Sequence, residues 1–391
     1  MRQIYAKTAL LPDGLAKDVA IEVNDAGVIC KVTPDRPGEG TQVSGLVLPG
    51  LINAHLHLEF SWFEAPVGGG DGFVPWIETV HTAQKEQPSP AARLELAGRA
   101  ARRLYAEGTA AVADIAGELH TAALLVDAGL QGVVEREFLG LSRTHQEELL
   151  ARCDQFLVTD DAGVVHRPAA HAPYSTSPEV IRRALGRQAR CPGAIHLAED
   201  EGELDFLARG EGPFAALLNE LGIDWGWWEP PACEPVTYLE QCDALGPGTL
   251  AVHCVHVSAA GLEKLAETQT PVCLCPRSNL HIGGRLPPVR EMIQAGVRLC
   301  VGTDSLASSP SLDVLDEIPV LAHHFPEVPT ETWLQLVTAG GADCLGLNTF
   351  GQIAPGFAPG LLWLRDCAHA DALRDRCETR RSWLIEPGRQ G

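Results

Sequence analysis

The chain has 391 residues, of which 45% are hydrophobic and 21% charged, so it can bury a large core and is too apolar for extended disorder. Its formal net charge of −21 disfavours a general nucleic-acid or anionic-membrane surface, because phosphate binding needs clustered lysine and arginine. The sequence shows no secretory signal and no bilayer-spanning run, so the 12 cysteines are expected to be mainly buried free thiols of a cytoplasmic protein.

The two ends of the chain differ from its middle. Short strands are predicted around Arg2–Ala6, Asp18–Val23 and Val28–Thr33, with glycine, aspartate and proline turns between them. The segment after about residue 349 has the same character, with a further strand at Leu361–Leu364. We therefore expect residues 1–48 and 349–391 to form one small, discontinuous β-sandwich domain.

From residue 46 onward, β-rich runs alternate with helical segments. The eight predicted strands are Leu46–His55, Gly108–Asp114, Gln131–Phe138, Val164–His171, Gly193–Leu197, Thr249–Cys254, Pro271–Cys275 and Val297–Gly302. The helices predicted between and after them are Pro90–Glu107, Leu119–Ala128, His145–Phe156, Pro178–Ala189, Ala259–Glu267, Val289–Ala295 and Leu312–His323. This alternation predicts an α/β fold with a (β/α)8 TIM-type barrel over residues 49–348, in which chemistry occurs at the carboxyl ends of the strands.

Candidate metal ligands follow several of these strands. His55 and His57 stand two residues apart on an extended segment, so both imidazoles point to the same side. Such a pair alone is a weak signal, because a histidine at a strand end is more often structural. His196 and Asp304, at the ends of the fifth and eighth predicted strands, would complete the set.

This donor set predicts one divalent metal ion with a coordination position left for water. Zinc suits three imidazoles and a carboxylate best, and Fe²⁺ or Mn²⁺ would also be accommodated. A bound divalent ion lowers the pKa of its water to about 7. Glu199 is the predicted proton shuttle, His253 would orient the water or polarise the group under attack, and Asp304 would share a proton while ligating.

Five short motifs in chain order resemble the amidohydrolase superfamily, in its nucleobase and nucleoside deaminase branch. They are Pro49–His57, His196-x-x-Glu199, His253-Cys254-x-His256, Cys275-Pro276-x-Ser278-Asn279 and Gly302-Thr303-Asp304. The resemblance covers nearly the whole chain and implies the ligand set above, with Glu199 protonating a ring nitrogen and His253 assisting the water. The reaction it implies is hydrolytic deamination, with release of ammonia from an amino-bearing aromatic carbon.

One missing residue indicates how many metal ions the site is expected to hold. Relatives with two metal ions use a carboxylated lysine at the end of the fourth strand, and this chain has no lysine between Lys85 and Lys264. The fourth predicted strand ends instead at His171, which favours a single ion. The motif P-C-x-x-C, which the small cytidine deaminase fold needs together with H-x-E, is also absent from the sequence.

The substrate is less closely constrained. In related purine-nucleoside deaminases the histidine that matches His171 lies near the purine or ribose, although a purely structural role is the alternative. Arg143 is a candidate for binding a substrate carboxylate, with Arg136 and Arg167 as competitors. The segment Phe73–Ile77 resembles the helix that closes over the substrate in this branch, or is core. The aromatic segment 222–234 would cover the barrel mouth or pack as a surface loop.

The segment Glu211–Phe214 resembles compact members of the branch that deaminate aminodeoxyfutalosine, an adenine nucleoside carrying a benzoate, in menaquinone biosynthesis. An adenine nucleoside with a carboxylated 5′ substituent is therefore the favoured small-molecule substrate. The alternatives are S-adenosylhomocysteine, methylthioadenosine or guanine deamination, and a chlorohydrolase of the same fold. A metal-free scaffold is disfavoured because the ligands and both acid–base residues are intact, and a homo-oligomer is left open.

Overall fold

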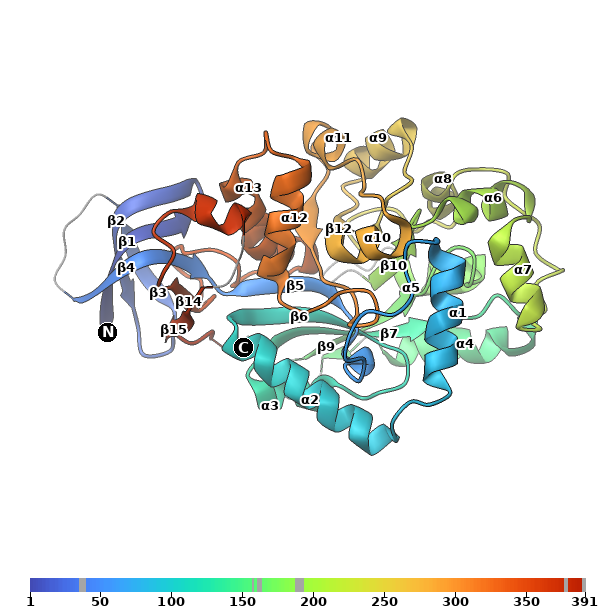
Figure 1. The fold of residues 1–391 in the computed structure, drawn as a ribbon, viewed down its shortest axis with the longest axis horizontal. Helices are drawn as coiled ribbons and strands as arrows, with labels where there is room; N and C mark the ends of the chain where they lie inside the picture. The colour runs from blue at the N-terminus through green and yellow to red at the C-terminus, as the bar shows by residue number, and fades with distance from the viewer. Residues whose placement is uncertain (35–39, 157, 160–163, 187–192, 376–378, 389–391) are drawn as a thin grey trace.

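The computed structural model describes residues 1–34, 40–156, 158–159, 164–186, 193–375 and 379–388 (Figure 1). It is an α/β protein in which a sheet built from both ends of the chain adjoins a larger helix-covered part. Among the described residues, no helix is both long and apolar enough to cross a membrane. The described cysteines are free, and most of them are buried.

The terminal sheet has six strands in the order β15-β14-β4-β1-β2-β3. Their bounds are β1 Arg2–Leu11, β2 Gly14–Val23, β3 Ile29–Thr33, β4 Thr41–Pro49, β14 Leu361–Leu364 and β15 Arg381–Ile385. The two ends of the chain meet where β14 pairs antiparallel with β4, as the sequence predicts for one discontinuous unit. Alternating buried residues along β1 and β2 face an apolar cluster that includes Ile4, Ile21 and Val43.

The larger part contains two parallel sheets. One has the order β5-β6-β7-β9-β8, and the other β10-β11-β12-β13. Their bounds are β5 Leu51–Leu56, β6 Thr109–Ala116, β7 Gln131–Phe138, β8 Val158–Thr159, β9 Val165–Ala170, β10 Gly193–Leu197, β11 Thr249–His253, β12 Val272–Leu274 and β13 Leu299–Val301. Strand β8 alone runs antiparallel to its neighbour. Both faces of β5, β6, β10 and β11 are buried, which explains their continuous apolar sequences.

The two parallel sheets approach each other at both of their edges. At one seam the backbone N–H of His196 donates to the carbonyl of His171 at 2.9 Å. At the other, the N–H groups of Thr303 and Asp304 donate to the carbonyl of His55 at 3.0 and 3.1 Å. The carboxyl end of β10 is thereby held to that of β9, and the carboxyl end of β13 to that of β5.

The first predicted strand, Leu46–His55, is wrong as a single element. The structure divides it at Gly50, so that Leu46–Pro49 belongs to the terminal sheet and Leu51–Leu56 to a parallel sheet. A Cβ atom on Gly50 would lie 2.5 Å from both the Ala110 side chain and the carbonyl of Pro359. This crowding explains why a residue without a side chain joins the two sheets.

Most predicted helices are confirmed to within a few residues. Helix α2 is Pro90–Ala106, α3 Ala122–Ala128, α4 Gln146–Gln155, α5 Pro178–Leu185, α9 Ala259–Glu267 and α11 Val289–Gln294. The hydroxyls of Ser89, Ser177 and Ser258 cap α2, α5 and α9, as their sequences suggest. The end predicted for α5, at Ala189, lies outside the described residues. The predicted helix Leu312–His323 is in fact a 3₁₀ turn, η3 Val314–Asp316, followed by α12 Glu317–His324.

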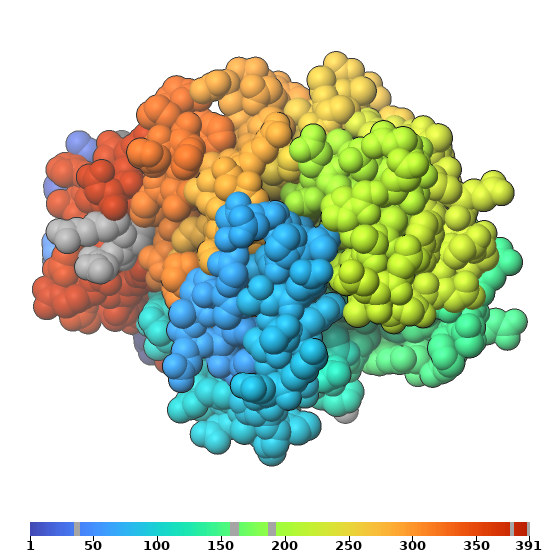
Figure 2. Space-filling model, turned by 45° about the vertical axis from the view of Figure 1, so that its right-hand side comes forward, coloured from blue at the N-terminus to red at the C-terminus, as the bar shows by residue number. Residues whose placement is uncertain are grey.

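Several further helices were not predicted as elements. They are α6 Glu201–Arg209, α7 Pro213–Glu220, α8 Pro235–Gln241, α10 Pro276–Gly283, α13 Thr330–Gln335 and α14 Gly341–Leu345. The segment Phe73–Ile77, which resembles a helix in the sequence, begins helix α1 Phe73–Gln84. Short 3₁₀ turns lie at η1 Leu58–Phe60, η2 Arg143–His145 and η5 Ala370–Arg374, and a π-helical turn lies at η4 Leu336–Gly340. Helix α1 packs against α7 and α10. Figure 2 shows the blue segment that contains α1 beside the yellow-green segment that contains α7.

Candidate active site

Three histidines and an aspartate from different strands converge at the carboxyl ends of the parallel sheets. The ring centroid of His55 lies 5.0 Å from that of His57 and 5.1 Å from that of His196. Oδ1 of Asp304 lies 3.4 Å from Nε2 of His57 and 3.9 Å from Nε2 of His55. The structure therefore brings the four predicted metal ligands together, and all four are buried.

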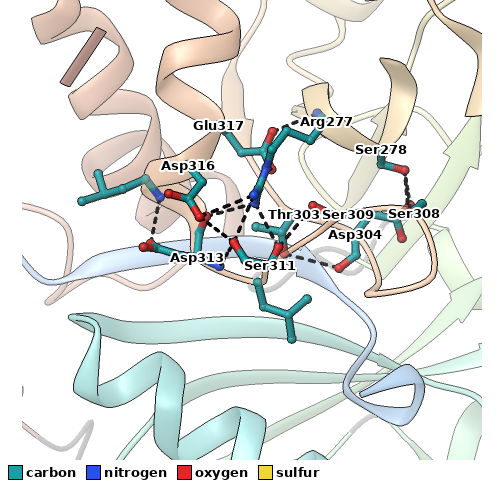
Figure 3. Close-up of polar contacts among 12 residues, drawn as sticks. Arg277, Ser278, Thr303, Asp304, Ser308, Ser309, Ser311, Asp313, Asp316 and Glu317 are labelled. Atoms are coloured by element: carbon teal, nitrogen blue, oxygen red, sulfur yellow. Dashed lines mark hydrogen bonds and ion pairs between the residues drawn. The ribbon is translucent and has the colours of Figure 1, made fainter. Parts of the chain in front are cut away.

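Hydrogen bonds orient these side chains from behind. Nδ1 of His196 donates to the carbonyl of His171 at 2.8 Å, which leaves its Nε2 atom for the centre of the site. Oδ2 of Asp304 accepts hydrogen bonds from Ser278 at 2.5 Å and from Ser308 at 2.9 Å (Figure 3). Its other oxygen, Oδ1, is thus the one directed at the histidines.

The arrangement fits a metal ion. Both ring nitrogens of His55 and Nδ1 of His57 are buried without a hydrogen-bond partner among the described residues. Burial of an unpaired polar atom is costly unless a ligand satisfies it. The ligand atoms of His55, His57 and Asp304 lie within 4.8 Å of one another, and imidazole with carboxylate is a donor set typical of catalytic zinc.

Glu199 and His253 lie beside this cluster. Oε1 of Glu199 is 3.5 Å from Nε2 of His253, and both side chains are nearly inaccessible to solvent. The side-chain amide of Asn279 donates to Nδ1 of His253 at 2.9 Å, so the neutral imidazole presents its N–H at Nε2, toward Glu199. His253 itself has a left-handed backbone (φ 73°), which turns its ring inward at the end of β11.

Burial keeps this pair uncharged. It lowers the pKa of His253 to about 3, an effect that the nearby Asp304 charge only partly offsets. Burial also raises the pKa of Glu199 well above its usual range, and the charges of Asp304, Glu203 and Asp200 raise it further. Both shifts favour a protonated carboxyl beside a neutral imidazole, an arrangement that is suited to donating a proton.

A cavity of about 280 Å³ opens onto these groups. His57, His196, Glu199, His253 and Asp304 line its floor. Helix α1 forms one wall through Phe73, Trp76, Ile77, Val80, His81 and Gln84. The N–H of Phe73 donates to Asp200 at 3.1 Å, so the beginning of α1 is tied to the segment that follows Glu199.

The predicted substrate residues separate into two groups. His171 lines the cavity, and its Nδ1 is 2.6 Å from the Ser175 hydroxyl. Arg143 is not among the residues that line the cavity, and its guanidinium lies 4.4 Å from the ring centre of Trp227. Arg136 and Arg167 do not line it either: they donate to the carbonyls of Gly117 and His166.

Besides Glu59 and Glu118, sequence reasoning missed two further charged residues in the cavity wall. Glu137 follows Glu135 at a spacing of two on β7, and its Oε1 lies 3.8 Å from Nδ1 of His196. Burial, followed by the charges of Glu59, Asp304 and Glu135, raises the pKa of Glu137 to about 8. Arg93, on α2, is the second. Glu137 could have been found from the sequence, because acidic residues within an otherwise apolar strand indicate a functional position. Arg93 could not, because its sequence context is that of an ordinary helix residue.

The aromatic segment 222–234 packs as a surface loop. Trp228 stacks on Phe206 at 4.9 Å, and the indole N–H of Trp227 donates to the carbonyl of Leu141 at 2.9 Å. No residue of this segment is among those that line the cavity. Of the two roles considered for it, packing is the one that the contacts favour.

Comparison with known proteins places this geometry in a family. The amidohydrolase family matches residues 46–365, and the N-terminal domain of formimidoylglutamate deiminase HutF matches residues 1–42. A 5-methylthioadenosine/S-adenosylhomocysteine deaminase from Pelotomaculum thermopropionicum is 26% identical over 373 residues, covering 90% of this chain and 81% of the relative. A 5′-deoxyadenosine deaminase from Methanoregula boonei is 29% identical over 370 residues, covering 86% and 76%.

A solved structure is similar over the full length of both chains. The crystal structure of Helicobacter pylori aminofutalosine deaminase in complex with methylthio-coformycin has a TM-score of 0.82 at 22% identity, and covers 100% of each chain. At this identity the likeness establishes the fold. Because the family match spans most of the sequence, the chain belongs to the amidohydrolase family and is a hydrolase that acts on carbon–nitrogen bonds.

Proposed function

We propose that this protein is a metal-dependent deaminase of adenine-type nucleosides. The observation that supports this most directly is the buried Glu199–His253 pair, 3.5 Å apart, beside a cluster of three histidines and an aspartate. Deamination of an adenine ring needs a proton donor for a ring nitrogen and an activated water, and the site offers groups for both. The relatives named above deaminate adenine nucleosides according to their names.

The fold proposed for the catalytic part is the (β/α)8 barrel over residues 49–348, with 1–48 and 349–391 as the small domain. The backbone hydrogen bonds at both seams between the two parallel sheets support closure of such a barrel. The convergence of His55, His196 and Asp304 at the carboxyl ends of their strands is the arrangement that this fold gives to active sites.

The metal ion is proposed to be held by His55, His57, His196 and Asp304, with zinc as the ion that these donors favour. When bound, it would make a water molecule nucleophilic at neutral pH. Glu199 would donate its proton to a ring nitrogen, and Nε2 of His253 would hold the attacking oxygen in place. Water supplies the new carbonyl oxygen and the amino group leaves as ammonia, so no redox partner is needed.

The substrate proposed is an adenine nucleoside with a carboxylated 5′ substituent, with aminodeoxyfutalosine, and hence a place in menaquinone biosynthesis, favoured. The full-length likeness to an aminofutalosine deaminase, with a TM-score of 0.82, supports this choice through the shared fold. S-adenosylhomocysteine and methylthioadenosine are the second candidates, because the similar sequences include deaminases named for both. His171, on the cavity wall, is proposed to contact the purine or the ribose.

The test is a screen of the purified holoenzyme for ammonia release. Aminodeoxyfutalosine, S-adenosylhomocysteine, methylthioadenosine, 5′-deoxyadenosine, guanine and a chlorotriazine are compared, with the absorbance change from adenine to hypoxanthine as second readout. We expect the wild-type enzyme to turn over at least one adenine nucleoside. Glu199→Gln should lose this activity, whereas the exposed control Glu220→Gln should retain it. Turnover of guanine or the chlorotriazine alone would contradict the proposal.

A further inference from the structure

We propose that Arg93, which lines the same cavity as the candidate metal ligands, is the residue that recognises the carboxylate of the substrate. This inference rests on the proposed function and deepens it, since it assigns a recognition site for the anionic part of the nucleoside. It also replaces Arg143, which does not line the cavity.

Arg93 is a buried cation whose hydrogen-bonding capacity is only partly used. It belongs to the first turn of α2, and its side chain is 9% exposed. Its Nε atom is buried and has no hydrogen-bond partner among the described residues. Since a buried guanidinium is stable only when its N–H groups are paired, the unpaired Nε–H leaves a hydrogen-bond donor that a ligand can satisfy.

The partner that Arg93 does have is easily exchanged. Its Nη2 atom lies 3.0 Å from Oε2 of Glu118, whose side chain is 72% exposed. A carboxylate so open to water is held weakly, because solvent screens the pair. A substrate carboxylate could take the place of Glu118 and bind Nε and Nη2 together, which is the bidentate geometry that guanidinium groups favour.

The wall around Arg93 is built to hold this position. The buried Glu59 accepts hydrogen bonds from the backbone N–H groups of Gly117 and Glu118 at 3.1 and 2.9 Å. Arg136 donates to the carbonyl of Gly117 from the other side. Oε2 of Glu59 is therefore engaged by the loop that it fixes, and the ion pair recorded for Arg93 is with Glu118 and not with Glu59.

The cavity connects Arg93 with the reaction centre. Arg93, Glu118, Glu199 and His253 all line the same cavity, which runs from the buried His253 side chain, 1% exposed, to the exposed Glu118. Among the described residues that line it, Arg93 is the only arginine or lysine. A nucleoside whose base lies over the metal ligands would thus direct its 5′ substituent toward a single positive group.

The charge of the wall favours a carboxylate over a phosphate. Glu59, Glu118 and Glu137 line the cavity together with Arg93. A monoanionic carboxylate that replaces Glu118 leaves the charge beside Arg93 unchanged, whereas a dianionic phosphate would add a negative charge among these acids. A neutral 5′ substituent would leave Arg93 with no better partner than Glu118.

The experiment compares two substrates that differ only in charge. Aminodeoxyfutalosine and its primary carboxamide are assayed for ammonia release with the wild-type holoenzyme, Arg93→Gln, Arg93→Lys and Glu118→Gln. The exposed Arg102→Gln, from the same helix, is the matched control. Adenosine 5′-monophosphate and 5′-deoxyadenosine are included as a phosphate-bearing and a neutral nucleoside.

We expect Arg93→Gln to lower kcat/KM for the carboxylate by about 100-fold and for the carboxamide by less than about 3-fold, since a charge-assisted bidentate contact is lost. Arg93→Lys should recover part of the loss, and Glu118→Gln should lower KM for the carboxylate. Retained turnover of the carboxamide shows that the variants are folded. Should both Arg93 variants fail to fold, the effect of Glu118→Gln on KM decides the question.

Equal losses on the two substrates, an unchanged KM in Glu118→Gln, or a preference for adenosine 5′-monophosphate would overturn the assignment of Arg93. These results would leave the proposed deaminase function intact, because the wild-type enzyme would still release ammonia from adenine nucleosides. Absence of turnover by the wild-type enzyme on these four compounds and also on S-adenosylhomocysteine and methylthioadenosine would instead overturn the proposed function.

Discussion

Nε2 of His253 and Oε1 of Glu199 lie 3.5 Å apart, from the ends of β11 and β10, with both groups held uncharged by burial. Two ionisable residues on adjacent parallel strands would be expected to form an ion pair in water. Here the surrounding protein removes the solvent that would stabilise both charges. Burial thereby raises the pKa of the Glu199 carboxyl, which favours the protonated form that a general acid needs.

The first prediction concerns that proton. Replacing Glu199 by glutamine removes the acid but keeps the size of the side chain, so kcat should fall about 10²–10⁴-fold. Ammonia release under substrate saturation measures it, with the exposed Glu220→Gln as control. The metal content of Glu199→Gln should equal that of the wild type. A loss of metal together with activity would show that Glu199 is a ligand instead.

The second prediction concerns the hydroxyls behind Asp304. Ser278 and Ser308 hold Oδ2 and so direct Oδ1 to the histidines (Figure 3). Ser278→Ala should weaken metal binding by about 10–100-fold, because outer hydrogen bonds fix the orientation of a ligand. Competition with a chelator, followed by elemental analysis, measures this affinity.

The control for Ser278 is Ser309→Ala. The Ser309 hydroxyl donates to the carbonyl of Ser311 and makes no hydrogen bond to Asp304 that the structure records. The two variants lose the same atom from the same region. If both retain zinc equally well in the chelator titration, the orientation of Asp304 does not depend on Ser278.

The third prediction is a pH dependence of stability that originates at Glu203. This side chain is fully buried on α6, and burial raises its pKa to about 8 although the backbone N–H of Glu199 partly opposes the shift. The usual pKa is 4.5, so between these values the folded state holds a proton that the unfolded state releases. The contribution of Glu203 is therefore fully present below pH 4.5 and decreases as the pH rises toward 8.

Glu203→Gln should remove this contribution. The free energy of unfolding of Glu203→Gln and of the wild type is measured by urea titration from pH 5 to 8. The value for the wild type should decrease more steeply with pH, and the two slopes should differ by about 1.4 kcal/mol per pH unit. The exposed Glu220→Gln should follow the wild-type curve. Parallel curves for Glu203→Gln and wild type would indicate that Glu203 is ionised in the folded protein.

The fourth prediction concerns the ion pair of Arg277 and Glu317. Glu317 is fully buried, its Oε1 lies 2.6 Å from Nε of Arg277, and its Oε2 accepts the backbone N–H of Arg277 at 2.9 Å (Figure 3). Arg277→Leu should destabilise the protein by about 3–5 kcal/mol, because it leaves a buried carboxylate without its cation. Urea unfolding at neutral pH measures the loss.

The matched control is an exposed pair of the same kind. Arg290 and Glu327 lie 2.6 Å apart with about half of each side chain exposed (51% and 43%), so Arg290→Leu should cost less than about 1 kcal/mol. The double variant Arg277→Leu/Glu317→Leu should recover part of the stability lost in Arg277→Leu. Similar losses for the two single variants would mean that burial does not set the cost.

The repeating pattern of the sequence was sufficient to predict most of the fold. Strands β7, β10 and β14 have the predicted bounds, because short apolar runs between turn residues have few alternatives to a buried strand. The break at Gly50 could not be predicted, since Leu46–His55 reads as one apolar run. Only the contact of Gly50 with Ala110 and Pro359, far away in sequence, explains it.

The sequence by itself determined which residues could form a metal site, because imidazole and carboxylate side chains at the ends of parallel strands must meet at one edge. His55, His57, His196, Asp304, Glu199 and His253 are all recognisable in this way, and the structure brings them together. Only the tertiary structure decided that Arg93 faces the cavity while Arg143 stacks on Trp227. A charged residue on a helix or in a loop has the same local sequence whether it faces water or a cavity, and its direction is set by packing between distant segments.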